Sequence, residues 1–464
     1  MPSRPRHSTS IIPAFSRRGL LAAAIAGPPL AAFALFAPPV HADPAVTGGD
    51  TRIVDVPLRD VLTRQVDGAT VREIAQQRCT MAGVTWDDPA QVLDVAVRAR
   101  DDNGTWSDWY RLEQMCDPST GEPVGGTELA WLGAVDAVQV RVEQRGADFT
   151  AAATAHLVTT SPAPDDAAPT RTAAGEHAPA NEPGTTTSTV TGAGGVGGTG
   201  GPIGFLPMGA PNPATPALGP GAPTFISRAA WGANESITRS TSGAKELKGI
   251  VIHHTEGSND YTASTSAQIL RGIQSYHAST LGWADVGYNL LIDKFGQIFE
   301  GRSGGLHRNI VGAHAYGFNT GTFGISVMGS YMAAAPSQAA RDAVARVIGW
   351  KLRSAFIAKA TDSVSWTPGD GTRLPAGVPV SLPRVFGHRD VNYTDCPGSA
   401  FYAQLGSVRT AAQMRLDASW RVHYDAFTKA GGASALGTVV RSAHSNGRFW
   451  ATELTKGLVL SEGS

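Results

Sequence analysis

Three side chains in this sequence, two imidazoles and one thiol, could together hold a metal ion. His253 stands near the end of an apolar run, and His388 and Cys396 lie eight positions apart further along the chain. Two imidazoles and a thiolate suit zinc, and three protein ligands leave a fourth position open for water, as in catalytic zinc sites. The alternative is that His253 is a hydrogen-bonded core residue, since twelve histidines allow many chance combinations.

The elements that must position these side chains are predicted by a mixture of strand and helix patterns over residues 225–416. Residues 249–255 form a buried-type strand that ends in polar side chains, and further strands are predicted over 286–292, 297–300, 323–328 and 385–386. A tight turn at 293–296 joins two of them. Apolar residues at helical spacing predict one helix around 269–277 and another after Ser337. We therefore expect an α/β domain over 223–418, with a central mixed β-sheet flanked by helices, and a long surface loop over 359–383.

A separate all-β, sandwich-like domain is predicted over residues 43–160, because apolar and polar side chains alternate with period two, most clearly over 93–98 and 138–143. Trp106, Trp109 and Trp131 could form a sugar-stacking face, but aromatic residues in such a domain are more often core. Residues 161–222 are rich in Ala, Pro, Thr and Gly and predict a disordered linker. Residues 419–464 form a C-terminal extension.

The first 42 residues have the pattern of a secretory signal peptide, with paired arginines before an apolar stretch and a small residue, Ala42, before the expected cut. Arg17 and Arg18 resemble a twin-arginine signal, which implies bacterial export. An ordinary secretion signal or an uncleaved anchor helix is the alternative, although paired prolines disfavour a long helix. No other segment has the roughly 20 apolar residues needed to span a bilayer, so we expect an exported protein with no membrane contact after cleavage.

The charge balance bears on the partners of the chain, and the cysteine content bears on its candidate metal site. The 38 Lys and Arg residues balance 39 Asp and Glu, so no overall charge draws the chain to nucleic acid. Cys79 and Cys116 lie in the N-terminal region, whereas Cys396 is far downstream. An odd cysteine in an exported protein needs a reason to stay reduced, and coordination to a metal is one.

His254, which directly follows His253, is a competing candidate for the same ligand position. Successive side chains of a regular strand point to opposite faces, so only one of the two histidines can face the metal.

Ordered sequence blocks over residues 225–416 resemble the peptidoglycan recognition protein and type 2 N-acetylmuramoyl-L-alanine amidase family, which includes phage T7-type lysozymes. The blocks occur in the order of the family: 226–232 (ISRAAWG), 251–255 (VIHHT), 276–277 (YH), 282–289 (GWADVGYN), 300–302 (EGR), 311–314 (VGAH), Asn319, 324–329 (GISVMG), 387–390 (GHRD) and 396–398 (CPG). They cover roughly two fifths of the chain. Residues 419–464 resemble a degenerate LGFP repeat of actinobacterial wall proteins, with a packing extension of the preceding domain as the alternative.

The resemblance implies a role for each matching residue. His253, His388 and Cys396 match the family's zinc ligands, which favours His253 over His254. Tyr288 matches the catalytic tyrosine near the reacting water, with a core aromatic as its alternative. Thr394 stands where phage enzymes have lysine and many animal members have threonine; a neutral hydroxyl donates one hydrogen bond, whereas lysine adds charge against an oxyanion. Four further residues match positions that line or border the peptide groove: His277, His314, Arg302 and Asn319. Arg302 and Asn319 could equally stabilise turns, and His314 could be a plain structural histidine.

The function implied is that of a zinc-dependent N-acetylmuramoyl-L-alanine amidase, which hydrolyses the amide between N-acetylmuramic acid and L-Ala of the stem peptide in bacterial peptidoglycan. We expect a monomer located outside the cell or at the cell wall. The matched blocks contain no glutamate that is an obvious general base. Two alternatives stay open: a non-catalytic peptidoglycan-binding receptor or wall-anchored scaffold, and an amidase acting on another acyl-peptide bond.

Overall fold

The structure is a computed structural model that describes residues 49–89, 91–116, 123–167, 171–172, 188–192, 215–219, 221–369, 371–417, 421–446 and 449–462. The predicted signal peptide and most of the predicted linker lie outside these residues. The described residues belong to one compact unit, Val46–Ser464. In this part of the chain, no helix has both the length and the apolar character needed to cross a membrane.

The N-terminal domain is built from antiparallel strands, which confirms the all-β prediction. The main path of its sheet runs β1 (Thr51–Pro57), β10 (Ala153–Thr160), β3 (Ala69–Trp86), β8 (Ala130–Gln144), β4 (Asp94–Arg100) and β5 (Tyr110–Leu112). Four shorter strands pair at its margins: β2 (Thr63–Val66), β6 (Gln114–Cys116), β7 (Pro123–Thr127) and β9 (Ala147–Asp148). Alternate residues such as Val95 and Val97, or Val138 and Val140, are fully buried and form the core.

The three tryptophans of this domain do not share one face. Trp131 is buried, but it packs in the apolar cluster around α2 of the α/β domain and not in the core of the β domain. Trp106 and Trp109 are only half-buried, and the Arg98 guanidinium lies 5.2 and 4.8 Å from their ring centroids. These two rings are therefore paired with a cation that belongs to the domain itself.

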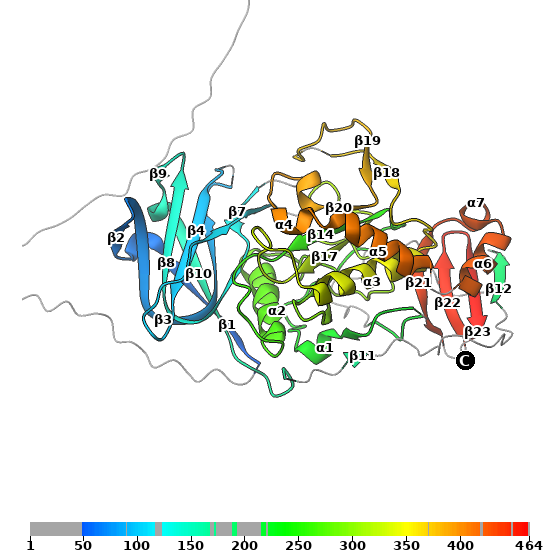
Figure 1. Cartoon of the computed structure of the whole chain (residues 1–464), viewed down its shortest axis with the longest axis horizontal. Coiled ribbons are helices and arrows are strands. Elements are labelled where there is room, and N and C mark those ends of the chain that lie inside the picture. The colour runs from blue at the N-terminus through cyan, green and yellow to red at the C-terminus, as the bar shows by residue number, and fades with distance from the viewer. Residues whose placement is uncertain are drawn as a thin grey trace, which may run out of the picture. The chain divides into compact units, whose positions relative to one another are not determined.

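The α/β domain contains the mixed sheet that the sequence predicts (Figure 1). Its strand order is β11 (Arg171–Thr172), β13 (Phe225–Ile226), β16 (Ile298–Glu300), β15 (Leu290–Ile292), β17 (Thr322–Val327), β14 (Gly249–His254) and β20 (Val385–Gly387). Strand β14 runs parallel to both β17 and β20, whereas β15 and β16 are antiparallel. Both faces of β14 are covered, which explains its nearly continuous apolar sequence.

Helices cover the two faces of this sheet. Leu290 and Ile292 of β15 pack with α3 (Gln338–Ser354) and α5 (Leu405–Asp417), which lie side by side in Figure 1. Leu291, between them, packs on the other face with α2 (Ser266–Ser275). Helix α2 continues into a π-helical turn (Tyr276–Thr280), and two short helices, α1 (Arg228–Trp231) and α4 (Ser399–Tyr402), complete the domain. The Ser337 side chain caps α3 by accepting a hydrogen bond from the Ala340 N–H.

Two predicted segments differ from the structure. Residues 359–383, expected to be a surface loop, contain two paired strands, β18 (Ser363–Trp366) and β19 (Val380–Pro383). Trp366 and Leu382 are buried against Phe318 and Phe386, so this ribbon has its own apolar anchor. The strand expected over 286–292 begins only at Leu290, because the Gly287 N–H is bonded to the ring of His277 rather than to a neighbouring strand.

The C-terminal extension folds as a small α/β unit. It consists of α6 (Arg421–Lys429), α7 (Gly432–Leu436) and the antiparallel strands β21 (Val439–Asn446), β22 (Phe449–Leu454) and β23 (Gly457–Glu462). A short segment of the linker region, β12 (Ser188–Gly192), pairs with β23, and another, β11, pairs with β13. The resemblance of this extension to an LGFP repeat stays a prediction.

Candidate metal centre

The carboxyl ends of two parallel strands bring the predicted metal ligands together. His253 lies at the end of β14, and His388 opens a 3-10 turn (His388–Asp390) directly after β20, the parallel neighbour of β14. The following loop returns Cys396 to the same point. One ligand atom from each of His253, His388 and Cys396 lies within 4.8 Å of the other two. The structure thus gathers the three side chains that the sequence singled out.

The spacing of these atoms fits a tetrahedral zinc ion. His253 Nδ1 lies 3.6 Å from Cys396 Sγ. Zn–N bonds of about 2.0–2.1 Å and Zn–S bonds of about 2.3 Å at a tetrahedral angle hold such atoms roughly 3.5 Å apart. The ring centroids of His253 and His388 are 4.6 Å apart. The donor set and its geometry therefore suit zinc.

A further histidine orients the first ligand. His253 Nε2 and His314 Nδ1 lie 3.0 Å apart, within hydrogen-bond distance. If Nδ1 of His253 binds a metal, its Nε2 carries the proton and donates it to His314. A histidine ligand commonly donates its other ring N–H to a neighbouring acceptor in this way, and the bond fixes the orientation of the ring. The His314 ring fits because Gly312 and Gly324 have no side chain: a Cβ at either position would lie 2.2 or 2.4 Å from its Cδ2.

Burial fixes the protonation of the free ligands. It lowers the pKa of His253 well below its usual value, with His388 and His314 adding to the effect, and it lowers the pKa of His388 to about 4. Both imidazoles are therefore neutral near pH 7 and keep a lone pair for a metal. Burial, and then the Glu113 carboxylate, raise the pKa of the Cys396 thiol well above its usual value. The thiolate form consequently needs the compensating charge of a cation.

His254, the competing histidine, is excluded as a ligand by its hydrogen bonds. Its Nδ1 accepts from the Tyr331 N–H at 3.2 Å, so the proton of the neutral ring must sit on Nε2. Burial lowers the pKa of His254 to about 3, which keeps the ring neutral. Atoms of Glu113, His254 and Glu256 also lie within 4.8 Å of one another. A protonated Nε2 cannot coordinate, so this second group does not have the ligands of a metal site.

The two predicted catalytic hydroxyls lie near the metal ligands and are already hydrogen-bonded. The Tyr288 ring centroid lies 5.3 Å from that of His253, and its hydroxyl donates to Glu128 Oε1 at 2.9 Å. The Thr394 hydroxyl donates to Glu113, which also accepts from the Asp395 N–H at 2.7 Å. Burial raises the pKa of Glu128 to about 8.

The sequence did not point to Glu113 or Glu128. Both belong to the N-terminal β domain, outside the family blocks, and Glu113 is 281 positions from Thr394. Nothing in the local pattern around either residue differs from an ordinary polar position of a strand end. Glu256, whose carboxylate accepts from the Glu113 N–H at 2.9 Å, lies one residue beyond the VIHHT block but matches no family ligand.

The four predicted groove residues occupy different environments. His277 is fully buried; its Nδ1 accepts from the Gly287 N–H, and its ring lies 6.2 Å from that of Tyr288. Arg302 donates to the carbonyls of Asp285 and Val286. Asn319 Oδ1 accepts from the N–H groups of His314 and Ala315. Arg302 and Asn319 therefore form hydrogen bonds within the loops around the centre, and their place in a peptide groove stays a prediction.

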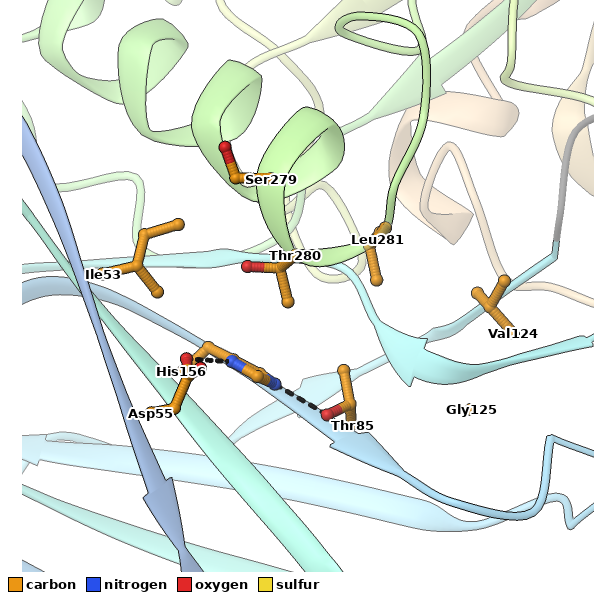
Figure 2. Close-up of a pocket in the computed structure, with 9 residues that line it drawn as sticks. All are labelled: Ile53, Asp55, Thr85, Val124, Gly125, His156, Ser279, Thr280 and Leu281. Carbon is orange, nitrogen blue, oxygen red and sulfur yellow. Dashed lines mark hydrogen bonds and ion pairs between the residues drawn. The ribbon is translucent and has the colours of Figure 1, made fainter. Parts of the chain in front are cut away.

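A pocket of about 490 Å³ lies away from these residues, between strands of the β domain and the end of the π-helical turn (Figure 2). At its wall, His156 contacts Asp55 Oδ1 through Nδ1 and Thr85 Oγ1 through Nε2, each at 2.7 Å. Figure 2 shows Thr280 and Leu281 on the opposite side of the pocket. Because Asp55, His156 and Thr85 come from adjacent strands and bond to one another, they form a cross-strand link within the β domain.

Comparison with known families divides the chain in the same way as the fold. Residues 243–399 match a family model described as N-acetylmuramoyl-L-alanine amidase. Residues 39–181 match a model described as Rv3811 N-terminal galactose-binding domain-like. The second match agrees with a separate all-β domain at the N-terminus.

Similar proteins come from animals. The Drosophila melanogaster peptidoglycan-recognition protein SC2 is 35% identical over 182 residues, which cover 39% of this chain and 84% of that protein. The Homo sapiens N-acetylmuramoyl-L-alanine amidase is 32% identical over 189 residues, which cover 40% of this chain and 28% of that protein. Among solved structures, wild-type Drosophila PGRP-LB is 26% identical, with a TM-score of 0.32, and covers 39% of this chain and 91% of its own.

Proposed function

Because this chain belongs to the peptidoglycan recognition protein and type 2 N-acetylmuramoyl-L-alanine amidase family, we propose that it is a zinc-dependent amidase. Its substrate is the amide between N-acetylmuramic acid and the L-Ala of the stem peptide. The observation that carries the proposal is the convergence of His253, His388 and Cys396 with the spacing of a tetrahedral zinc site. Three protein ligands leave room for a reacting group, which a closed structural site does not.

The metal would be held by these three side chains, and the remaining chemistry falls to neighbouring residues. When bound, zinc supplies Lewis-acid polarisation of the scissile carbonyl and makes hydroxide available near neutral pH. Tyr288 would donate its hydroxyl proton to the developing oxyanion, and Thr394 would donate a second hydrogen bond. His314 keeps the His253 ring in its orientation. His277 and His314 are the candidate groove residues nearest the centre, whereas Arg302 and Asn319 shape its loops.

We further propose that the protein is exported and acts on peptidoglycan outside the membrane, as the signal-like first 42 residues indicate. The test is to incubate metal-loaded protein with purified sacculi and to measure newly exposed L-Ala amino termini. Release of L-Ala termini supports the amidase. Binding to sacculi without release would instead identify a peptidoglycan receptor, and product mass analysis would expose cleavage of another acyl-peptide bond.

A further inference from the structure

The hydrogen-bond donors of the candidate active site are occupied by carboxylates of the N-terminal β domain. Glu128 accepts from the Tyr288 hydroxyl at 2.9 Å. Glu113 accepts from the Thr394 hydroxyl and from the Asp395 N–H. Three donors close to the metal ligands are thus taken by two side chains that come from another domain.

The hydrogen bonds to these side chains oppose catalysis. Amide hydrolysis develops negative charge on the carbonyl oxygen, and catalysis requires hydrogen-bond donors or positive charge at that place. A glutamate oxygen that accepts from Tyr288 or Thr394 removes that donor from the reacting carbonyl. Glu113 and Glu128 therefore hold the donors that the oxyanion would use.

We propose that the N-terminal β domain is an intramolecular inhibitor, whose Glu113 and Glu128 carboxylates occupy the donors that the substrate carbonyl would use. The inference rests on the proposed amidase function and adds a means of regulation to the same site. In the closed arrangement the ligands His253 and Cys396 are 1% and 4% exposed. Hydrolysis requires the β domain to move away from the centre.

The contact between the domains is specific. Asp166, in the segment that directly follows the last strand of the β domain, pairs bidentately with Arg271 of α2 at 2.7 and 2.8 Å, and both side chains are buried. Trp131 donates to the Asp260 carbonyl through Nε1, and its own carbonyl accepts from the Ser258 N–H. At Gly257, with φ of +82°, a Cβ would lie 2.5 Å from the Trp131 nitrogen, so only glycine permits this approach.

The same interface contains features that make it separable. Three carboxylates meet there, because Glu256 accepts from the Glu113 N–H. Burial raises the pKa of Glu256 well above its usual value, and repulsion from Glu113 raises it further. The polar pocket in Figure 2 lies between the same two domains, so part of their contact is open rather than packed. A contact of this kind resembles the more polar interfaces between domains that move.

The first test compares full-length, metal-loaded protein with the double variant Glu113→Ala/Glu128→Ala. Hydrolysis of muramyl dipeptide should rise in kcat/KM by on the order of tenfold or more, because the variant loses three inhibitory hydrogen bonds and each contributes about 1 kcal/mol. Glu143→Ala, which removes a carboxylate from strand β8 of the same domain, is the control and should match the unmodified protein. A fall in rate would make the carboxylates part of the catalytic machinery, and an unchanged rate would show that the contact does not limit hydrolysis; either overturns the proposal.

A second readout does not depend on hydrolysis. In metal-free protein, alkylation of Cys396 by iodoacetamide, followed by mass spectrometry, should be about tenfold faster in the double variant, since closure buries the thiol. Cys79, buried in the β-domain core, should stay unreactive in both and so reports that the variant is folded. Equal rates at Cys396 overturn the closure. Faster alkylation with no hydrolysis in any protein refutes the amidase and leaves the closure supported.

Discussion

At the scale of the residue, Cys396 lies between groups that favour its thiolate form and groups that oppose it. Its Sγ accepts a hydrogen bond from the His254 N–H at 3.4 Å and faces His253 Nδ1 at 3.6 Å. The hydrogen bond from the His254 N–H favours the thiolate form. The neighbouring carboxylates act in the opposite direction, because Glu113, Glu128 and Glu256 all raise the pKa of the thiol.

The substitution Cys396→Ser tests the ligand assignment. Serine is a poorer zinc ligand than a thiolate. Zinc affinity should therefore fall by more than the roughly 10- to 100-fold that results from mutating a residue hydrogen-bonded to a ligand. Bound zinc after dialysis, measured by atomic emission, and L-Ala release should fall together. Cys79→Ser is the matched control and should retain zinc. Full zinc occupancy in Cys396→Ser would show that another residue is the ligand.

The role of Tyr288 is best tested where Glu128 no longer occupies its hydroxyl. In the Glu113→Ala/Glu128→Ala background, Tyr288→Phe should lower kcat by on the order of a hundredfold, as expected for the loss of one oxyanion donor. Zinc content should not change, because the ring remains and the hydroxyl is not a ligand. A kcat equal to that of the background protein would assign Tyr288 to the core, the alternative that its burial allows.

At the scale of the element, strand β17 determines how the first ligand is held. Gly324 lies on β17 next to β14, with Val251 as its Cα partner, and its missing side chain leaves space for the His314 ring. The strand therefore contributes to the metal centre without providing a ligand. This explains why a glycine stands inside a buried strand, where it is otherwise unfavourable.

The substitution Gly324→Ala should displace His314 and so release the His253 ring from its orientation. A Cβ there would lie 2.4 Å from the His314 ring. We expect zinc affinity to fall roughly 10- to 100-fold, measured by competition with a chromophoric chelator. Gly406→Ala on α5, where a Cβ would meet nothing within 4 Å, is the control. Unchanged affinity in Gly324→Ala would mean that His314 does not orient His253.

At the scale of the whole molecule, buried neutral histidines couple stability to pH. Burial lowers the pKa of His254, His277, His314 and His423 to about 3 in each case. In the unfolded chain histidine has a pKa of about 6.5. Between these values the unfolded state binds protons that the folded state does not, so the free energy of unfolding falls as pH decreases below about 6.5.

The metal-free protein should therefore have a lower urea midpoint at pH 5 than at pH 7. Each such histidine contributes up to about 1.4 kcal/mol per pH unit. His423→Gln replaces a buried ring that is hydrogen-bonded to Thr452, far from the metal centre. It should reduce the change in the free energy of unfolding per pH unit by the contribution of one proton. A midpoint that does not change between pH 7 and pH 5 would show that these rings are protonated in the folded protein.

The sequence by itself determined the residue types of the three candidate ligands, their order and the strand that carries the first of them, because these depend on residue identity and local periodicity. It also indicated the mixed sheet and the separate β domain, whose alternating patterns are local. The ribbon within residues 359–383 was not predicted, because its burial depends on Phe318 and Phe386 from other segments.

Only the tertiary structure decided which atoms face one another. A hydrogen bond from the Tyr331 N–H, 77 positions away in the chain, occupies Nδ1 of His254 and so supports His253 as the candidate ligand that the resemblance favours. The contacts of Glu113 with Thr394 and of Glu128 with Tyr288 join two domains across a linker whose composition specifies no distance between its ends. Such contacts cannot be predicted from a sequence pattern, because they follow from how the two folded domains pack and not from the residues beside each glutamate.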